Sequence, residues 1–476
     1  MRDRATARFT VLAITAAMVA GACSSASSRS AVDTTAPRST VALSNPEPGS
    51  PANFGEPPAV PSGPMDAEVV SAIQQIFGPS LEDRIFDVED RQALDVLGRS
   101  GDVRVAWLFS DLLRFVIGED TRPRVLSNAL MVTQLDLQPQ DDWQLFTDHL
   151  IAWDIPAPPD YLEAKKSLFT LVDPRWEPLF DSDGEVDWRH VSWGGVLIDD
   201  RPFGDPHRCE VSCIPAADDP PTTDAAGGSW YPDDRIVFGV EINGEARAYP
   251  KHIMEIREMV NDTVGGRDVA MPYCTLCGSA QVFLTDEVDG FDRPILRTSG
   301  LLSRSNKVMY DLNTKSVFDT FLGRAVTGPM LEAGVKLPQV SVVTTTWGAW
   351  KAEHPSTTIL GEGLDFDNPN GFDPLRGRDD NGPIFPIGDV DPRLPVSEPV
   401  LGVVSPKSGN PIAFHVALAI ATLQNGDSVE YDGVRLVRSG SGLRAIDVDG
   451  HDLGGHQAFW FAWSQFHPDT VIWPVE

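Results

Sequence analysis

The chain has 476 residues with 69 acidic and 38 basic side chains, which give a formal net charge of −31 at pH 7. A surface of this sign repels the phosphates of nucleic acids, so we expect no nucleic-acid partner. The length is sufficient for two or three folded domains, and most of the excess charge is expected to lie on a solvated surface.

The N-terminal 22 residues have the pattern of a signal peptide. Arginines within the first eight residues precede an apolar run over 9–20, which is too short to cross a bilayer. Residues 20–23 read Ala-Gly-Ala-Cys and resemble a bacterial lipobox, in which the chain is cut before the cysteine and its thiol is lipidated. The sequence therefore predicts a lipid anchor on Cys23 that attaches the protein to the outer face of the cell membrane. The alternative is an ordinary signal peptide followed by a chance cysteine.

A linker and a helical segment are expected next. Residues 23–64 are rich in Ser, Thr, Ala and Pro, a composition that predicts a disordered linker from the membrane. Between residues 65 and 172, apolar side chains recur at helical spacing, as in Leu108, Leu112 and Val116. This segment is expected to fold as five or six antiparallel helices with a scaffolding or docking role.

The sequence after residue 172 changes to short apolar runs separated by Gly, Pro, Asn and Asp, a texture typical of strands and turns. Three blocks of this part occur twice in the same order. The clearest has two tryptophans, a His-Pro pair and a threonine over 347–357, and it returns with identical spacing over 460–470. Because tryptophans at i and i+3 share one face of a helix, we interpret the block as structural, with His354 and His467 ending the two helices.

These patterns predict an α+β fold. An N-terminal helical bundle over 65–172 is expected to precede two related β-rich lobes, 173–365 and 366–476, produced by an internal duplication. The first lobe carries an insert that the second lacks. Shared residues are better explained by folding and unshared residues by function, so the insert supplies the candidate site residues, which are Arg257, Glu258, Asp262 and a Cys-x-x-Cys turn.

Four cysteines of the mature chain form two short-spaced pairs, Cys209 with Cys213 and Cys274 with Cys277. Disulfides are the default for paired cysteines outside the cytoplasm. Alternatively, the four thiolates hold one zinc or another thiophilic metal ion, and their sulfurs then converge on one point. The third alternative is thiol–disulfide exchange. The apolar run after Cys277 predicts a hairpin, not the helix that follows a thioredoxin-type Cys-x-x-Cys.

Two Asp-rich stretches offer oxygen ligands for calcium. They lie at 181–187 and 365–380. Neither has the EF-hand spacing with Gly at loop position six, so calcium is the lesser metal expectation.

Several linked motifs between residues 205 and 360 resemble one bacterial family. The motifs are Cys213-Ile214-Pro215-Ala216-Ala217-Asp218-Asp219-Pro220, Phe238-Gly239-Val240, Gly244-Glu245-Ala246-Arg247-Ala248-Tyr249-Pro250, Val260-Asn261-Asp262, Tyr273-Cys274-Thr275-Leu276-Cys277-Gly278, Ser299-Gly300-Leu301-Leu302, Met309-Tyr310-Asp311 and Thr346-Trp347-Gly348. They resemble the family catalogued as domain of unknown function 3179, with a weaker second copy toward the C-terminus. The resemblance implies a secreted or membrane-attached protein and supplies no activity. Where the family pattern has His-Glu before Val-Asn-Asp, this chain has Arg257-Glu258, and His252 lies nearby in sequence.

Three classes of function follow from these patterns. The Cys-x-x-Cys turn favours an extracytoplasmic lipoprotein with a metal or thiol–disulfide site. The helical segment, the repeat and the acidic surface favour a cell-surface binding or scaffolding protein with structural disulfides. A hydrolase comes third, because the sequence has no Gly-x-Ser-x-Gly elbow, zinc-protease His-Glu-x-x-His or phosphate-binding Gly loop. The sequence does not name the protein or small-molecule partner.

Overall fold

The computed structural model describes residues 49, 53–81, 86–137, 142–205, 207, 209, 212–361, 375 and 382–474. The expected signal peptide, Cys23 and most of the expected linker lie outside these residues, as does most of the Asp-rich stretch at 365–380. Within the described ranges, no helix combines the length and the apolar character needed to cross a membrane.

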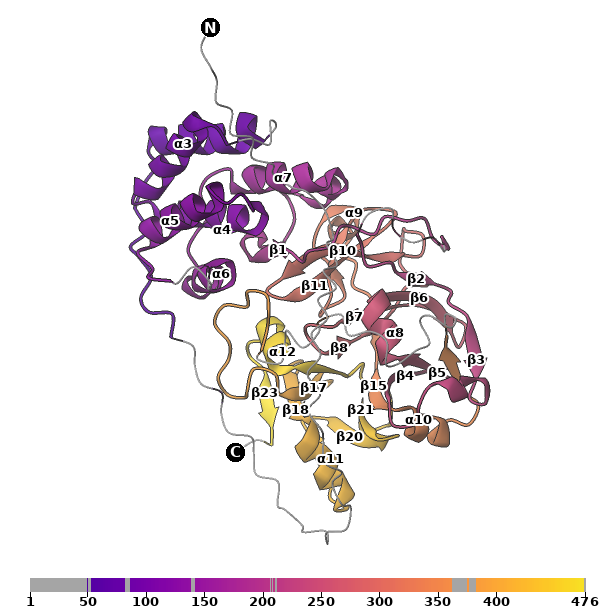
Figure 1. Cartoon of the computed structure of the whole chain (residues 1–476). Helices are drawn as coiled ribbons and strands as arrows, with labels where there is room; N and C mark the ends of the chain where they lie inside the picture. The colour runs from indigo at the N-terminus through magenta and orange to yellow at the C-terminus, as the bar shows by residue number, and fades with distance from the viewer. Residues whose placement is uncertain are drawn as a thin grey trace, which may run out of the picture.

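Six α-helices form the N-terminal part of the described chain (Figure 1). They are α1 (Ala67–Gln75), α3 (Val88–Arg99), α4 (Ala106–Phe115), α5 (Thr121–Thr133), α6 (Asp142–Trp153) and α7 (Tyr161–Val172). The start of α3 is a capping box, in which Asp87 accepts the backbone N–H of Asp90 and the side chain of Asp90 accepts that of Asp87. Helix α4 is the central one, because every residue in it except Arg114 is buried.

Five small sheets form the rest of the molecule and follow one another in a ring, the arrangement of a five-bladed β-propeller (Figure 1). Sheet 1 has the order β1 (Val191–Trp193), β10 (Leu296–Ser303), β11 (Asn306–Asp311), β12 (Val317–Asp319), β13 (Arg324–Ala325). Sheet 2 has the order β14 (Gln339–Val340), β9 (Val282–Leu284), β7 (Arg267–Cys274), β6 (Met259–Val264), β2 (Ala217–Asp218), with β8 (Ser279–Ala280) paired to β7.

Sheets 3 to 5 complete the ring. Sheet 3 has the order β15 (Val343–Thr346), β4 (Ile236–Ile242), β5 (Glu245–Pro250), β16 (Thr358–Leu360), β3 (Thr222–Asp224). Sheet 4 has the order β22 (His456–Phe459), β17 (Pro399–Val404), β18 (Pro411–His415), β23 (Val471–Trp473), and sheet 5 has the order β19 (Val429–Tyr431), β20 (Val434–Ser439), β21 (Gly442–Ile446). The connections contain α8 (Lys251–Arg257), α9 (Gly328–Glu332), α10 (Trp347–Glu353), α11 (Val416–Gln424) and α12 (Trp460–Phe466).

The prediction of a helical bundle followed by two β-rich lobes is wrong. Leu108 and Phe169 of the helices belong to the same buried cluster as Leu301 and Tyr310 of sheet 1, so the helices share a core with a sheet and do not form a separate bundle. The β-rich part is divided among five sheets, not between two lobes. Helical periodicity reveals that one face of a segment is buried, but it does not reveal which element covers that face.

The first and third repeated blocks lie in sheets 3 and 4 and the helices that follow β15 and β22, whereas the second block, at 289–300 and 432–440, lies in sheets 1 and 5. Strands β15, β4, β5 and β16 of sheet 3 have the same order and directions as β22, β17, β18 and β23 of sheet 4. In each sheet a glycine lies under a tryptophan ring: an added Cβ would lie 2.5 Å from the Trp350 ring at Gly239 and 2.1 Å from the Trp463 ring at Gly402. Each of the two histidines is the residue at which its helix ends, as predicted, although Nε2 of His354 is buried without a hydrogen-bond partner among the described residues.

Candidate functional site

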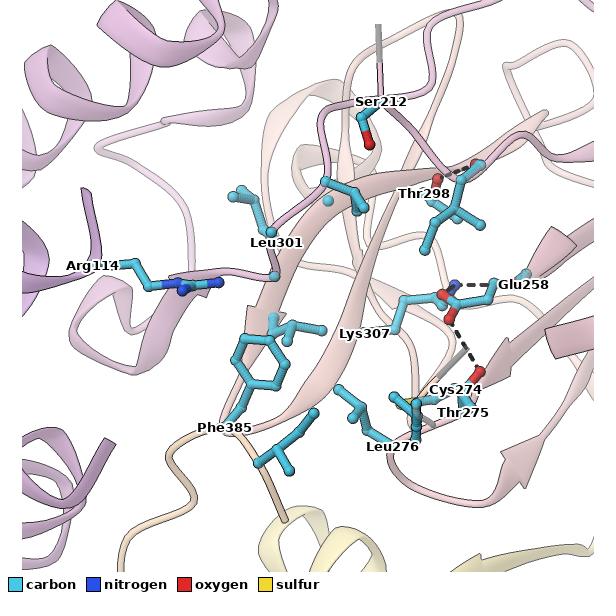
Figure 2. Close-up of a pocket in the computed structure, with 18 of the residues that line it drawn as sticks. Arg114, Ser212, Glu258, Cys274, Thr275, Leu276, Thr298, Leu301, Lys307 and Phe385 are labelled. Carbon is cyan, nitrogen blue, oxygen red and sulfur yellow. Dashed lines mark hydrogen bonds and ion pairs between the residues drawn. The ribbon is translucent and has the colours of Figure 1, made fainter. Parts of the chain in front are cut away.

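A cavity of about 1330 Å³ lies where the helices, sheet 1 and the Cys-x-x-Cys turn meet (Figure 2). Its walls come from α4 and α6, from β10 and β11, from the segment 212–215, from the end of α8 and from residues 384–385. This volume exceeds that of the usual small-molecule pocket, which is roughly 300–1,000 Å³. The cavity is therefore large enough for an organic ligand.

The Cys-x-x-Cys turn joins β7 to β8 as a tight hairpin, as the sequence predicts. Cys274 pairs with Ser279 across the antiparallel ladder, and the N–H of Cys277 donates to the carbonyl of Cys274 at 3.2 Å. Gly278 has φ 59°, in the left-handed region, and a Cβ there would lie 3.0 Å from the ring of Phe459. The turn therefore packs against sheet 4. Position 278 favours glycine because its backbone is left-handed and because a side chain there would crowd the ring of Phe459.

Cys274 and Cys277 form a disulfide that is placed asymmetrically in the wall. Cys274 is among the residues that line the cavity and is 3% exposed, whereas Cys277 is 0% exposed. Sγ of Cys277 lies 2.9 Å from Oδ1 of Asn306 and 3.5 Å from the carbonyl oxygen of Ser305. The amide nitrogen of Asn306 donates to the carbonyl of Arg304 at 3.2 Å, which leaves Oδ1 facing the sulfur. A disulfide has no hydrogen to offer these acceptors, whereas a thiol has one.

A buried ion pair adjoins the turn. Nζ of Lys307 lies 2.5 Å from Oε2 of Glu258 and also donates to the backbone carbonyl of Glu258 at 3.1 Å. Thr275, inside the Cys-x-x-Cys turn, donates its hydroxyl to Oε1 of Glu258 at 3.1 Å. Burial lowers the pKa of Lys307, and the nearby Glu258 carboxylate opposes that shift. Glu258 therefore links the end of α8, the cysteine turn and β11.

The backbone at Glu258 explains why α8 delivers this side chain to the cavity. Glu258 has φ 50° and is the residue at which α8 ends. Its N–H donates to the carbonyl of Met254 at 2.8 Å, and its carbonyl accepts the N–H of Tyr273 at 3.0 Å. A left-handed conformation at a residue other than glycine is sparsely populated, and such residues are often found at functional sites.

The other sequence candidates from the same segment lie elsewhere. His252 is buried and stacks on Tyr231, with ring centroids 5.3 Å apart. Asp262 is buried against Arg247, with an oxygen 2.6 Å from the guanidinium. Arg257, at the end of α8, donates to the carbonyl of Pro215 at 3.4 Å. None of these three side chains is among the described residues that line the cavity, whereas Glu258 and Cys274 are.

Cys209 and Cys213 form the second disulfide, and Cys213 also lines the cavity. Their sulfurs lie close to a carboxylate oxygen of Asp199, which makes this group one of two potential metal-ligand clusters in the described ranges, while Cys274 and Cys277 belong to neither. Asp199 already bonds Arg201 at 2.7 Å and accepts a backbone N–H at 2.8 Å. The four sulfurs therefore form two pairs and not one tetrahedral cluster, so the alternative of disulfides agrees with the structure.

The Asp-rich stretch at 181–187 uses its carboxylates within the protein. Asp181 accepts the backbone N–H groups of Asp183 and Gly328, both at 3.0 Å, and Asp187 pairs with Arg189 at 2.6 Å. These contacts explain the acidic side chains as turn and ion-pair residues. The second metal-ligand cluster in the described ranges, Asp447 with Asp449 and His451, is an exposed turn bound together by its own hydrogen bonds.

Sequence reasoning missed Lys307, Asn306 and Arg114. Lys307 and Asn306 belong to β11, which is buried along its whole length, so both side chains are polar groups in a covered strand. Arg114 is the one residue of α4 that is not fully buried, and it also lines the cavity. The sequence does show a charged residue inside an apolar run. Such a residue indicates a functional site only if both faces of its helix or strand are buried, which the sequence does not reveal.

Residues 211–433 match the family model described as "Protein of unknown function (DUF3179)". This match supports the family to which the motifs point, and it covers sheets 2 and 3, the cavity wall around the cysteine turn, and the first strands of sheet 4. No curated protein and no solved structure matches the chain. The family description assigns no activity.

Proposed function

We propose that the protein is an extracytoplasmic lipoprotein that exchanges thiols and disulfides at the Cys274–Cys277 pair. The position of the pair carries the proposal, because Cys274 faces a large cavity and Cys277 is buried behind it. An incoming thiolate therefore has one sulfur to attack and a second sulfur as the leaving group.

The exchange has two steps and balances without any metal or cofactor. A thiolate of a dithiol partner attacks Sγ of Cys274, the Cys274–Cys277 bond breaks, and Cys277 leaves as a thiolate that takes a proton. The second partner thiolate then attacks the partner sulfur of the mixed disulfide and releases Cys274, which also takes a proton. Two electrons and two protons move from the partner dithiol to the cysteine pair.

The surroundings of the pair support the reduced form. Once Cys277 carries a hydrogen, it can donate to Oδ1 of Asn306 at the observed separation of 2.9 Å. The carbonyl of Ser305 lies 3.5 Å from the same sulfur and 3.9 Å from Sγ of Cys274. These acceptors stabilise thiols more than they stabilise a disulfide, so they favour a pair that is easily reduced.

The comparison between sheets 3 and 4 supports placing the function in the first insert. We infer that the two sheets are copies of one duplicated unit, the second of which is the weaker family copy. The cysteine turn and Glu258 lie between β5 and β15 of the first unit. The corresponding interval of the second unit holds α11 and sheet 5 instead.

The redox proposal is tested with two double variants. In Cys209→Ser/Cys213→Ser, only the Cys274–Cys277 disulfide remains, and the matched control Cys274→Ser/Cys277→Ser keeps only the other. We expect reduced dithiothreitol to expose two alkylatable thiols in the first variant while its near-ultraviolet circular dichroism stays native, and oxidised glutathione to restore the disulfide. If thiols appear only together with unfolding, the pair is a structural staple and the protein belongs to the class of surface binding or scaffolding proteins.

The same reduced samples test the metal alternative. Zinc is added to the reduced wild-type protein, and the bound zinc is measured after gel filtration. We expect less than one equivalent, because Cys274 and Cys277 share no metal-ligand cluster with Cys209 and Cys213. One tightly held equivalent that is lost in Cys274→Ser would favour a metal site over an exchange site.

Membrane attachment is tested separately. We propose that Cys23 carries the lipid and that the protein faces outward, because residues 20–23 have the lipobox pattern. Cys23→Ala is expected to move the protein from the membrane fraction to the soluble fraction or to stall its processing. Unchanged fractionation with membranes would remove the anchor from the proposal.

A further inference from the structure

The charged residues of the cavity wall differ in the ion pairs and hydrogen bonds that they make. Lys307 pairs with Glu258, and Glu255 pairs with Lys251 across one turn of α8. Asp148 accepts the backbone N–H groups of residues 387 and 388, at 2.7 and 2.8 Å. Arg122, which also lines the cavity, donates to the carbonyl oxygens of Leu113 and Val116. Arg114 differs from these groups, because no carboxylate of the described residues lies within ion-pair distance of it and its one hydrogen bond is to a backbone carbonyl.

Arg114 is held in place by aromatic rings and a backbone carbonyl, although the described residues offer it no carboxylate partner. Its guanidinium lies over three aromatic rings, 4.6 Å from the centre of Trp143, 5.2 Å from Trp193 and 5.4 Å from Phe385. Its Nε donates to the carbonyl oxygen of Trp193 at 2.7 Å. The two terminal nitrogens make no hydrogen bond to the described protein. Figure 2 shows the guanidinium directed into the cavity from α4.

The charge on Arg114 persists at neutral pH. Burial lowers its pKa to about 10, and the neighbouring positive charge of Arg122 adds to the shift. A cation that is mostly removed from water without a counter-ion is costly, and an anion that enters the cavity would relieve that cost. The planar fork of a guanidinium matches a carboxylate, which accepts two parallel hydrogen bonds.

The wall between Arg114 and the cysteine turn is apolar. Leu301 and Phe385 lie next to the guanidinium, and Leu276 lies toward Cys274, as Figure 2 shows. A ligand that fits both features has an acidic head group and an apolar body. We propose that this cavity binds an amphipathic organic acid, with its carboxylate on Arg114 and its apolar part over Leu301, Phe385 and Leu276. This inference goes beyond the exchange activity and holds whether or not the disulfide opens.

The test is isothermal titration calorimetry on the full mature protein, with dodecanoate kept below its critical micelle concentration as the probe. Dodecanol and dodecylammonium have the same chain length with a neutral and a positive head group. We expect the wild-type protein to bind dodecanoate at least about tenfold more tightly than either control, because only the carboxylate pairs with Arg114. Equal affinities for the three probes would overturn the proposal without the need for any variant.

Variants then locate the contact. Arg114→Gln is expected to weaken dodecanoate binding about tenfold and to leave dodecanol binding unchanged, which also shows that the cavity is still formed. Arg114→Lys keeps the charge and should retain part of the preference for the anion. Arg393 lies 5.4 Å over the ring of Trp460 but is paired with Asp391, so Arg393→Gln is the matched control and should bind like the wild type.

Two further outcomes separate this inference from the redox proposal. Cys274→Ser cannot exchange thiols and should still bind dodecanoate as the wild type does, whereas a wild-type protein that binds dodecanoate but shows no exchange would overturn only the redox function. Dodecanoate binding that is unchanged in Arg114→Gln would overturn the anion site and leave the redox function standing.

Discussion

Sheets 3 and 4 share one plan and differ in what is inserted into it. Both have the same strand order, a tryptophan ring over a glycine, and a helix that ends at a histidine. Between β5 and β15, sheet 3 receives residues 251–342, which build most of sheets 1 and 2 and the cysteine turn. Sheet 4 receives residues 416–455, which build only α11 and sheet 5. The comparison teaches that the shared strands and tryptophans maintain a scaffold, and that the longer insert of sheet 3 supplies the β10, β11 and cysteine-turn walls of a cavity whose other walls include α4 and α6.

The largest effect is expected from removing the repeated tryptophan in either sheet. Trp350 is 1% exposed and Trp463 is 2% exposed, and each fills the space above a glycine. Replacing either with alanine should lower the free energy of unfolding by about 3–5 kcal/mol, because it leaves a large cavity. Urea denaturation measures both values, and Val448→Ala, at a side chain that is 75% exposed, is the control with an effect within about 0.5 kcal/mol. A large loss of stability in only one of the two variants would show that the two tryptophans are not equivalent.

Acid sensitivity should distinguish sheet 4 from sheet 3. In sheet 4, His456 lies opposite Gly402, and the equivalent residue of sheet 3, opposite Gly239, is Val343. Burial lowers the pKa of His456 to about 3. The unfolded histidine takes a proton below about pH 6.5 while the folded one remains neutral, so this group lowers stability as pH falls from about 6.5 toward 3.

We expect His456→Val to remove about 2 kcal/mol of the stability that the wild type loses between pH 7 and pH 5. The free energy of unfolding in urea at the two pH values provides the measurement. Burial also lowers the pKa of His467, to about 4. The His456→Val variant should therefore still lose some stability as the pH falls. An identical loss in the variant and the wild type would show that His456 does not titrate on unfolding.

A smaller effect is expected from the two threonines of the repeated block. Trp350 donates its indole N–H to Thr357 and Trp463 donates to Thr470, each at 2.9 Å. Thr357→Val and Thr470→Val should each cost about 1–3 kcal/mol, because a buried donor is left without an acceptor. Thr422→Val, which removes a bond only to the carbonyl of Leu418 in its own helix, is the control in the same measurement. Thr357 also donates to the carbonyl of Ala246 at 3.1 Å, so Thr357→Val should be the more destabilising of the two, and a larger loss in Thr470→Val would contradict this comparison.

The smallest effect concerns the insert. Asn306 is 1% exposed and its Oδ1 faces Cys277. Asn306→Ala should shift the equilibrium between dithiol and disulfide toward the disulfide by about 0.5–1 kcal/mol, because the reduced thiol loses an acceptor. Thiol alkylation in a series of glutathione buffers gives the shift, and Asn425→Ala, at the exposed end of α11 in the other insert, should cause none. An unchanged ratio would mean that Asn306 only packs against the sulfur.

Prediction from sequence worked where the signal was local. The 3.6-residue periodicity found the helices, and the apolar run after Cys277 indicated a hairpin, because each signal depends on neighbours within a few positions. The repeated block also identified equivalent segments, since identical spacing requires similar local geometry. The candidate residues of the insert do not stay together: Glu258 and Cys274 line one cavity, whereas His252 and Asp262 lie in other surroundings.

The sequence by itself determined where helices, turns and the repeated blocks lie, because those features depend on contacts within a short stretch of chain. Only the tertiary structure decided how these pieces group, since the side chain that covers a buried face can come from any distance along the chain. Lys307 meets Glu258 across 49 positions, and Arg114 meets Trp193 across 79. Sequence periodicity cannot indicate such long-range contacts, so the ring of five sheets, the cavity between it and the helices, and the Arg114 guanidinium that faces this cavity are evident only in the folded chain.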